Sequence, residues 1–137
     1  MTGDARVLPD VNILLAYGWR QHPFHAQCSS WIDALSGFAT CPITELGFMR
    51  VSMSPAFRAS YDDASRMLAA LTQIDGAQFL PCDLPAERMS VVSRYKDTTD
   101  AYLVSLAKNH SYRFATLDEG ILKERWASGV AYNPIAM

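Results

Sequence analysis

The chain has 137 residues, of which half are apolar and 19% are charged, and its formal net charge is −2. This length suits one domain with a substantial core, and no apolar run approaches the roughly 20 residues that span a membrane. The net charge argues against a strongly basic nucleic-acid coat. The chain does not begin with a basic segment followed by a long apolar run, so we expect no signal peptide and a cytoplasmic protein.

The three cysteines are odd in number and widely spaced, at Cys28, Cys41 and Cys82. They form no CxxC pair or Cys/His cluster, so a zinc site is not expected. The sequence has no repeat, low-complexity segment or Gly/Ser linker. Residues 1–137 are therefore predicted to form a single domain.

Short strand-like runs alternate with longer helical patterns in the first half of the chain. The helix predicted at 22–37 has apolar residues at a 3.6-residue spacing and is ended by Gly37. The predicted elements, in chain order, are a strand at 6–8, helices at 12–19 and 22–37, a strand at 38–41, and helices at 43–53 and 61–75.

The alternation continues in the second half, where Pro85 is expected to open a helix. The predicted elements are a strand at 77–81, helices at 85–95 and 98–110, a strand at 113–117, a helix at 118–129 and a strand at 130–134. Strands that alternate with helices indicate βαβ crossovers and a mostly parallel sheet covered on both faces. Functional residues of such sheets gather beyond the carboxyl ends of the strands.

Four acids lie at positions that the strand-end rule or the helical pattern marks as candidates for a functional site. Asp10 and Asp118 each follow a predicted strand. Glu45 lies in the first turn of the helix that follows another predicted strand, at 38–41. Asp100 opens a helix and lies on the same stripe as Leu103, which faces the sheet. A carboxylate on a buried face needs a partner.

Each acid also has an ordinary structural explanation, because Asp and Glu favour helix caps and first turns. Few basic residues accompany three of them, with Arg50 the nearest. Clustered carboxylates repel one another unless they are protonated or bind a cation. An all-oxygen ligand set favours Mg²⁺ or Mn²⁺, and such an ion suits phosphate-ester chemistry. Setting four carboxylates aside changes the remaining charge from −2 to +2.

Three stretches of the chain resemble the PIN domain, and specifically the VapC-type toxins of type II toxin–antitoxin pairs. They read LPDVNILLAY at 8–17, CPITELGFMRV at 41–51 and TTDAYLVSLAKNHSYRFATLDEGI at 98–121. The resemblance runs nearly end to end. It implies a three-layer α/β/α sandwich with a mostly parallel central sheet, and metal-dependent endoribonuclease activity.

The resemblance also implies roles for particular residues. Asn12 and Thr116 match polar positions that orient ligands and water by hydrogen bonding. Arg50 is left with two interpretations, as a contact to the scissile phosphate or as a structural partner of an acid. The acids that match the catalytic, metal-binding quartet of the family are Asp10, Glu45, Asp100 and Asp118.

The stretch SRYKDTTD at 93–100 departs from the Gly-His-Arg-like pattern of the family. Asp97 adds an acid one helical turn before Asp100, where it is expected to cap the helix or, as the alternative, to reach the metal through water. Glu119 is expected to face solvent, with an auxiliary ligand as the alternative.

The function predicted on these grounds is that of a toxin that cleaves RNA with Mg²⁺ or Mn²⁺ as cofactor. The expected partners are RNA, a cognate antitoxin and a second copy of the chain, with no membrane. The alternative is a catalytically inert PIN-like interaction module. A receiver domain or a haloacid-dehalogenase-type phosphatase is disfavoured, because Asn12 stands where a second acid is needed and no lysine lies near 130–134.

Overall fold

The computed structural model describes residues 6–136. The expectation about the start of the chain rests largely on residues 1–5, which lie outside the described part. The strands are β1 (Val7–Pro9), β2 (Ala39–Thr40), β3 (Gln78–Phe79), β4 (Arg113–Ala115) and β5 (Ala131–Tyr132). The α-helices are α1 (Val11–Gly18), α2 (His25–Asp33), α3 (Pro42–Ser52), α4 (Tyr61–Thr72), α5 (Thr98–Asn109) and α6 (Glu119–Leu122). Short 3₁₀ turns occur at η2 (Ala86–Arg88), η3 (Tyr95–Asp97) and η4 (Arg125–Ala127).

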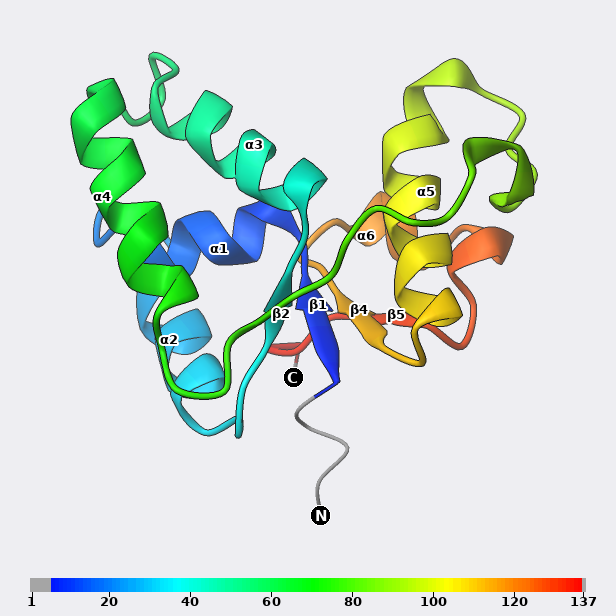
Figure 1. Ribbon diagram of the computed structural model, residues 1–137, viewed down its shortest axis with the longest axis horizontal. Helices are drawn as coiled ribbons and strands as arrows, with labels where there is room; N and C mark the ends of the chain where they lie inside the picture. Colours follow the sequence, from blue (N-terminus) through cyan, green and yellow to red (C-terminus); the bar gives the residue numbers. More distant parts are fainter. Residues whose placement is uncertain (1–5, 137) are drawn as a thin grey trace.

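The strands form the middle layer of the molecule (Figure 1). β1 pairs with β4 and β4 with β5, while β2 pairs with β3, and every one of these pairings is parallel. The two ladders lie side by side because β1 contacts β2. The predicted parallel sheet is confirmed, and its carboxyl ends share one edge.

Helices cover the sheet on both sides, with α1 to α4 on one side and α5 and α6 on the other (Figure 1). Alternation along the strands supplies a core to each layer, because successive side chains point to opposite faces. Val7 and Ala115 pack with the α1–α4 layer, whereas Leu8 and Phe114 pack with α5. The prediction of a three-layer α/β/α sandwich is therefore confirmed.

The helix predicted at 85–95 is wrong. The 3₁₀ turn η2 forms at its start and η3 begins at Tyr95, while Met89 after η2 is extended at φ −70° and ψ 165°. The Ser90 backbone N–H donates to the Ser105 Oγ of α5 at 3.0 Å. A tertiary contact thus takes a donor that a helix would use internally, and Val91 is left 92% exposed.

Two other predicted helices are shorter than expected. The one at 118–129 divides into α6 and η4, because Glu124 is extended at ψ 141°. The one at 22–37 is helical only over α2, since Gly37 has a φ of 153° and leads into β2. A Cβ on Gly37 would lie 2.2 Å from the carbonyl oxygen of Gly76, so this close backbone approach requires glycine.

No helix in the described part of the chain is both long enough and apolar enough to cross a membrane.

Candidate active site

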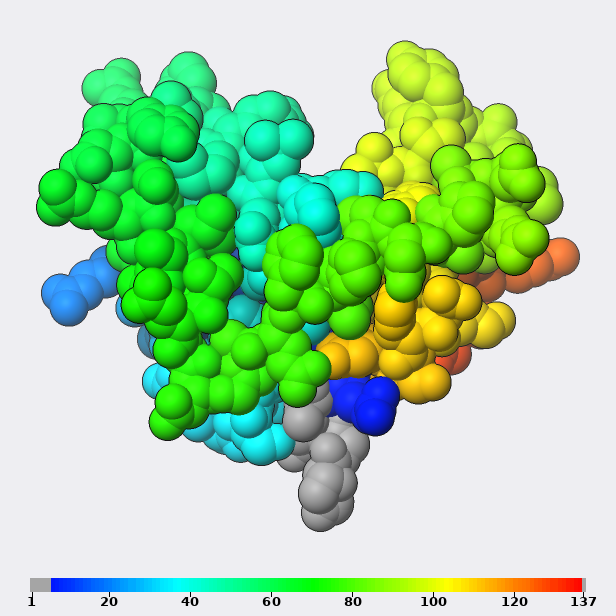
Figure 2. All heavy atoms as spheres, in the orientation of Figure 1, coloured from blue at the N-terminus to red at the C-terminus, as the bar shows by residue number. Residues whose placement is uncertain are grey.

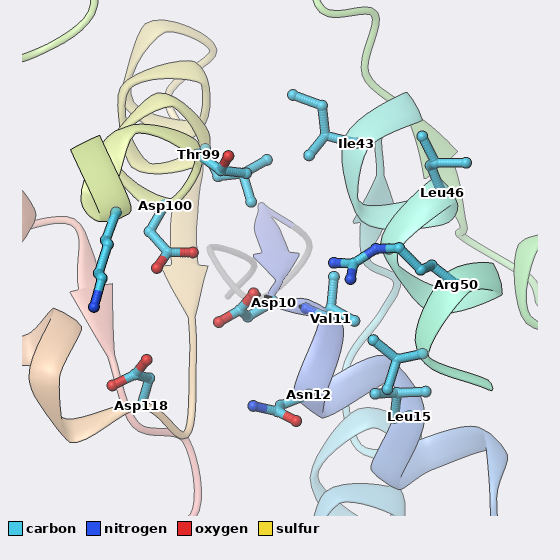
Figure 3. Close-up of a pocket in the computed structure, with 14 residues that line it drawn as sticks. Asp10, Val11, Asn12, Leu15, Ile43, Leu46, Arg50, Thr99, Asp100 and Asp118 are labelled. Carbon is cyan, nitrogen blue, oxygen red and sulfur yellow. Dashed lines mark hydrogen bonds between the residues drawn. The ribbon is translucent and has the colours of Figure 1, made fainter. Parts of the chain in front are cut away.

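An open pocket of about 460 Å³ lies between α3 and α5, beyond the carboxyl ends of β1 and β4. Figure 2 shows the surface hollowed between the cyan α3 side and the yellow α5 side. Three of the predicted acids, Asp10, Asp100 and Asp118, line this pocket together (Figure 3). They come from three separate segments, so the fold rather than the local sequence brings them together.

Asp10 is the most buried of the three acids, at 7% exposed. It follows β1 directly and caps α1, where its Oδ1 accepts from the Val11 N–H at 2.8 Å. Its other oxygen accepts from the Thr116 hydroxyl at 2.8 Å. Burial raises the pKa of Asp10, these two bonds oppose that rise, and the charge of Asp118 adds to it. The side chain is therefore rigidly held, and its negative charge is costly without a cation.

Thr116 links two of the acids. Its hydroxyl donates to Asp10 and accepts from the Asp118 N–H at 3.0 Å, and the side chain is fully buried. The Thr116 hydroxyl therefore connects the Asp10 carboxylate to the backbone of Asp118. Asn12 also lines the pocket, one residue beyond the Asp10–Val11 step, and it is exposed.

Asp100 and Asp118 extend the acidic side of the pocket. Asp100 lies in the first turn of α5, and burial, together with the charges of Asp10, Asp118 and Asp97, raises its pKa to about 6. Asp118 caps α6 and accepts from the Gly120 N–H at 2.8 Å. Asp118 is therefore both a helix cap and a pocket residue.

Glu45 differs from the other three acids, because its carboxylate does not line the pocket. The face of α3 that does so carries Ile43, Leu46 and Arg50 at a helical spacing. Glu45 lies two residues after Ile43, on another side of the helix, and its Oε2 accepts from the Thr40 hydroxyl at 2.7 Å. Three of the four predicted acids thus line the pocket together. Glu45 does not, because α3 presents another of its faces to the pocket.

Two cations line the pocket, and the sequence analysis identified only one of them. Arg50 points into the pocket from α3, across from the carboxylates (Figure 3). Lys96 reaches it from η3, directly before α5. In the stretch ahead of Asp100 the sequence drew attention to Asp97 and gave Lys96 no role. The position of Lys96 just before the Asp100 helix was the signal that could have identified it.

The two additional acids are also placed. Asp97 stands at the cap position of α5 without capping it, because its carboxylate is bound by the Arg94 guanidinium through two contacts of 3.0 Å. Glu119 is exposed, as expected, and accepts weakly from Asn133 at 3.4 Å. Neither residue lines the pocket.

The donor chemistry of the pocket fits a hard cation. Its three acids offer only oxygen atoms, and the like charges of Asp10, Asp100 and Asp118 raise the pKa of Asp10 and of Asp100. A cation between them would relieve this repulsion. Within residues 6–136, no group of three or more His, Cys, Asp or Glu side chains is close enough together, as the side chains stand, to hold a metal ion.

Comparison with known proteins gives consistent matches over most of the chain. The profile described as "PIN domain" matches residues 7–125. Ribonuclease VapC38 of Mycobacterium tuberculosis (strain ATCC 25618 / H37Rv) is 40% identical over 121 residues, which is 83% of this chain and 86% of the relative. Ribonuclease VapC39 of Mycobacterium tuberculosis (strain CDC 1551 / Oshkosh) is 36% identical over 124 residues, which is 83% of this chain and 89% of the relative. Ribonuclease VapC44 of the same strain is 37% identical over 125 residues, 85% and 88% of the two chains.

Proposed function

The chain belongs to the PIN-domain family and, within it, to the VapC-type ribonucleases, and on that premise we propose that it is a metal-dependent endoribonuclease acting as the toxin of a toxin–antitoxin pair. The observation that carries the proposal is the convergence of Asp10, Asp100 and Asp118 in one open pocket at the strand ends. The substrate would be RNA, cleaved at a phosphodiester bond. The site of action would be the cytoplasm, where RNA is available.

In this proposal Asp10, Asp100 and Asp118 hold one or more Mg²⁺ or Mn²⁺ ions. A divalent cation held there would supply positive charge for the phosphate oxygens and would lower the pKa of a water molecule for use as the nucleophile. Whether Glu45 contributes stays a prediction, since the Thr40 hydroxyl donates to its carboxylate and Glu45 does not line the pocket.

The residues of the chain itself would orient the reacting groups. Thr116 fixes the Asp10 carboxylate and the backbone that carries Asp118, so these two acids keep a constant separation when RNA binds. Arg50 faces them from the opposite wall, where its guanidinium can donate two hydrogen bonds to one phosphate. The interpretation of Arg50 as a substrate contact is therefore preferred over that of a structural partner.

The proposed protein partners are an antitoxin and a second copy of the chain. Leu46 is 70% exposed on the α3 wall, beside the partly buried Ile43. This apolar edge suits an apolar antitoxin segment, and a basic side chain of that segment would suit the carboxylates. Other large apolar side chains are exposed as well, including Phe79 and Val91, and a homodimer would cover part of that surface.

A catalytically inert interaction module is the second candidate. The observation that favours it is the absence of Glu45 from the pocket lining. Such a module would bind partners through the same fold without cleaving RNA.

Cleavage of total RNA with Mg²⁺, followed by mapping of the new 5′ ends, separates the two functions. We expect the wild-type protein to produce discrete ends that disappear with EDTA and with Asp100→Asn. Asp63→Asn is the matched control, because Asp63 is an exposed first-turn acid of α4 outside the pocket. Equal cleavage by wild type and Asp100→Asn in preparations free of other nucleases would refute the proposal, and no cleavage by any of them would favour the inert module.

A further inference from the structure

Lys96 is a pocket cation for which nothing above supplies a role. It is exposed and lines the same pocket as Asp100 and Asp118. Nevertheless, Lys96 makes no ion pair within 4.0 Å with any carboxylate of residues 6–136. A cation beside three acids that is not paired with one of them is available to a ligand.

The turn that carries Lys96 is held in place by its own side chains. The Asp97 N–H donates to the Arg94 carbonyl at 3.1 Å, and the Arg94 guanidinium binds the Asp97 carboxylate through two contacts of 3.0 Å. The Thr98 hydroxyl donates to the Tyr95 carbonyl at 2.9 Å. These bonds fix the backbone on both sides of Lys96, so its position at the pocket edge is defined by the turn.

The two basic residues of this segment, Arg94 and Lys96, differ in whether a carboxylate binds them. Arg94 is committed, because Asp97 binds it and the Glu124 carboxylate lies 3.8 Å from its Nη2. Lys96 has no such partner among the described carboxylates and reaches the pocket instead. Asp97 and Glu124 therefore neutralise the Arg94 guanidinium, whereas the Lys96 ammonium has no partner among the described carboxylates.

Arg50 and Lys96 border the pocket from different elements, α3 and η3, and three carboxylates lie in the same pocket. A polyanion that approaches these carboxylates meets repulsion unless nearby cations offset it. The chain carries a net charge of −2, so it has no general basic coat to supply that attraction. The few cations at the pocket edge must do so.

We propose that Lys96 is a substrate-binding residue that contacts an RNA phosphate on the α5 side of the pocket, next to the phosphate that Arg50 and the carboxylates address. This inference rests on the proposed ribonuclease function and assigns part of its substrate recognition. A lysine ammonium is a point charge that binds phosphate without a fixed orientation. Lys96 would therefore strengthen binding of the strand without selecting a base.

The test is the binding of a fluorescein-labelled single-stranded RNA of mixed sequence to proteins that all carry Asp100→Asn, so that no cleavage intervenes. Anisotropy is measured in Mg²⁺ over a range of KCl concentrations. We expect Lys96→Ala to weaken binding about five- to tenfold near physiological salt. It should also reduce the slope of log Kd against log salt concentration by the amount expected for the loss of about one phosphate contact. Lys96→Arg should restore most of the binding, because it keeps the charge.

Lys108→Ala is the matched control, since Lys108 is an exposed lysine at the other end of α5 that does not line this pocket. It should change Kd less than twofold. In the active background, Lys96→Ala should raise KM with little change in kcat, because the contact is made equally before and during reaction. The inference is overturned if Lys96→Ala matches Lys108→Ala in Kd and salt slope, or if it lowers kcat alone. If the wild-type protein cleaves RNA, either of these results leaves the ribonuclease proposal intact. If the wild-type protein does not cleave RNA, the ribonuclease proposal itself is contradicted.

Discussion

The two helices that border the pocket, α3 and α5, carry an acid in the first turn but present it differently. Asp100 of α5 lines the pocket, and burial together with its acidic neighbours raises its pKa to about 6. Glu45 of α3 accepts from Thr40 outside the pocket, while Ile43 and Leu46 form the pocket wall. The comparison shows that a first-turn acid reaches a site only if the helix is rotated to present it.

The difference also divides the pocket by chemistry. The α5 side holds the charges, and the α3 side is apolar except for Arg50. In the proposed function, the carboxylates for phosphate chemistry therefore lie near α5 and β1, and the apolar side chains for partner recognition lie on α3. The first three of the following experiments test this division, and the last tests how closely α3 packs on α1.

The largest expected difference is in cleavage. Asp100→Asn should reduce the rate of RNA cleavage at least about 100-fold, since it removes a charge from the reacting centre. Glu45→Gln should reduce the rate about 10-fold at most, because Gln can still accept from Thr40. Initial rates with end-mapped RNA measure both. A loss in Glu45→Gln as large as that in Asp100→Asn would show that Glu45 moves into the pocket during the reaction.

The next effect is on stabilisation by Mn²⁺. At about 100 times its Kd, a bound ion adds about 2.7 kcal/mol to the free energy of unfolding. Asp10→Asn should lose most of this gain, whereas Glu45→Gln should keep it. Thermal melting with and without Mn²⁺ gives the comparison. An equal Mn²⁺-dependent rise in Tm for wild type and Asp10→Asn would contradict the placement of the ion on the β1 side.

A smaller effect is expected on the pH dependence of stability in EDTA. Folding raises the pKa of Asp100 from 3.8 to about 6, so the ionised carboxylate costs stability as the pH rises through that interval. Asp100→Asn should therefore stabilise the protein at pH 8 by about 1 kcal/mol, a value reduced for the partial solvent exposure of Asp100. The gain should largely disappear at pH 4.

Urea unfolding at the two pH values measures this gain, with Asp63→Asn as the control that should show no such dependence. An Asp100→Asn gain of the same size at pH 4 and pH 8 would mean that the effect comes from packing and not from charge.

The smallest expected effect concerns the packing of α3 on α1. A Cβ on Gly47 would lie 2.7 Å from Val11 Cγ2, and both residues line the pocket. Gly47→Ala should destabilise the protein by up to about 1 kcal/mol, because overpacking offsets the gain in helix propensity. In a Val11→Ala background the same change should become stabilising. If Gly47→Ala is stabilising in both backgrounds, α3 is free to move away from α1.

The sequence predicted much of this protein from local patterns. The alternation of strands and helices was enough for a parallel α/β/α sandwich, because side-chain periodicity reflects which face is buried. Asp10 and Asp118 were found because they follow strands, and the end of a strand in a parallel sheet is a fixed place. Thr116 came from the family resemblance, and its two hydrogen bonds agree with the expected role.

Other features depended on contacts between distant segments. The stretch at 85–95 has helix formers, but Ser105 of α5 holds its backbone extended. The carboxylate of Glu45 and the position of Lys96 depend on how α3 packs on α1 and α4 and how η3 packs on α5, which spacing along one element does not determine. The sequence by itself determined the alternation of strands and helices and which acids follow the strands, since these depend on near neighbours. Only the tertiary structure decided which charges share the pocket, because that depends on helix rotation and on partners far along the chain.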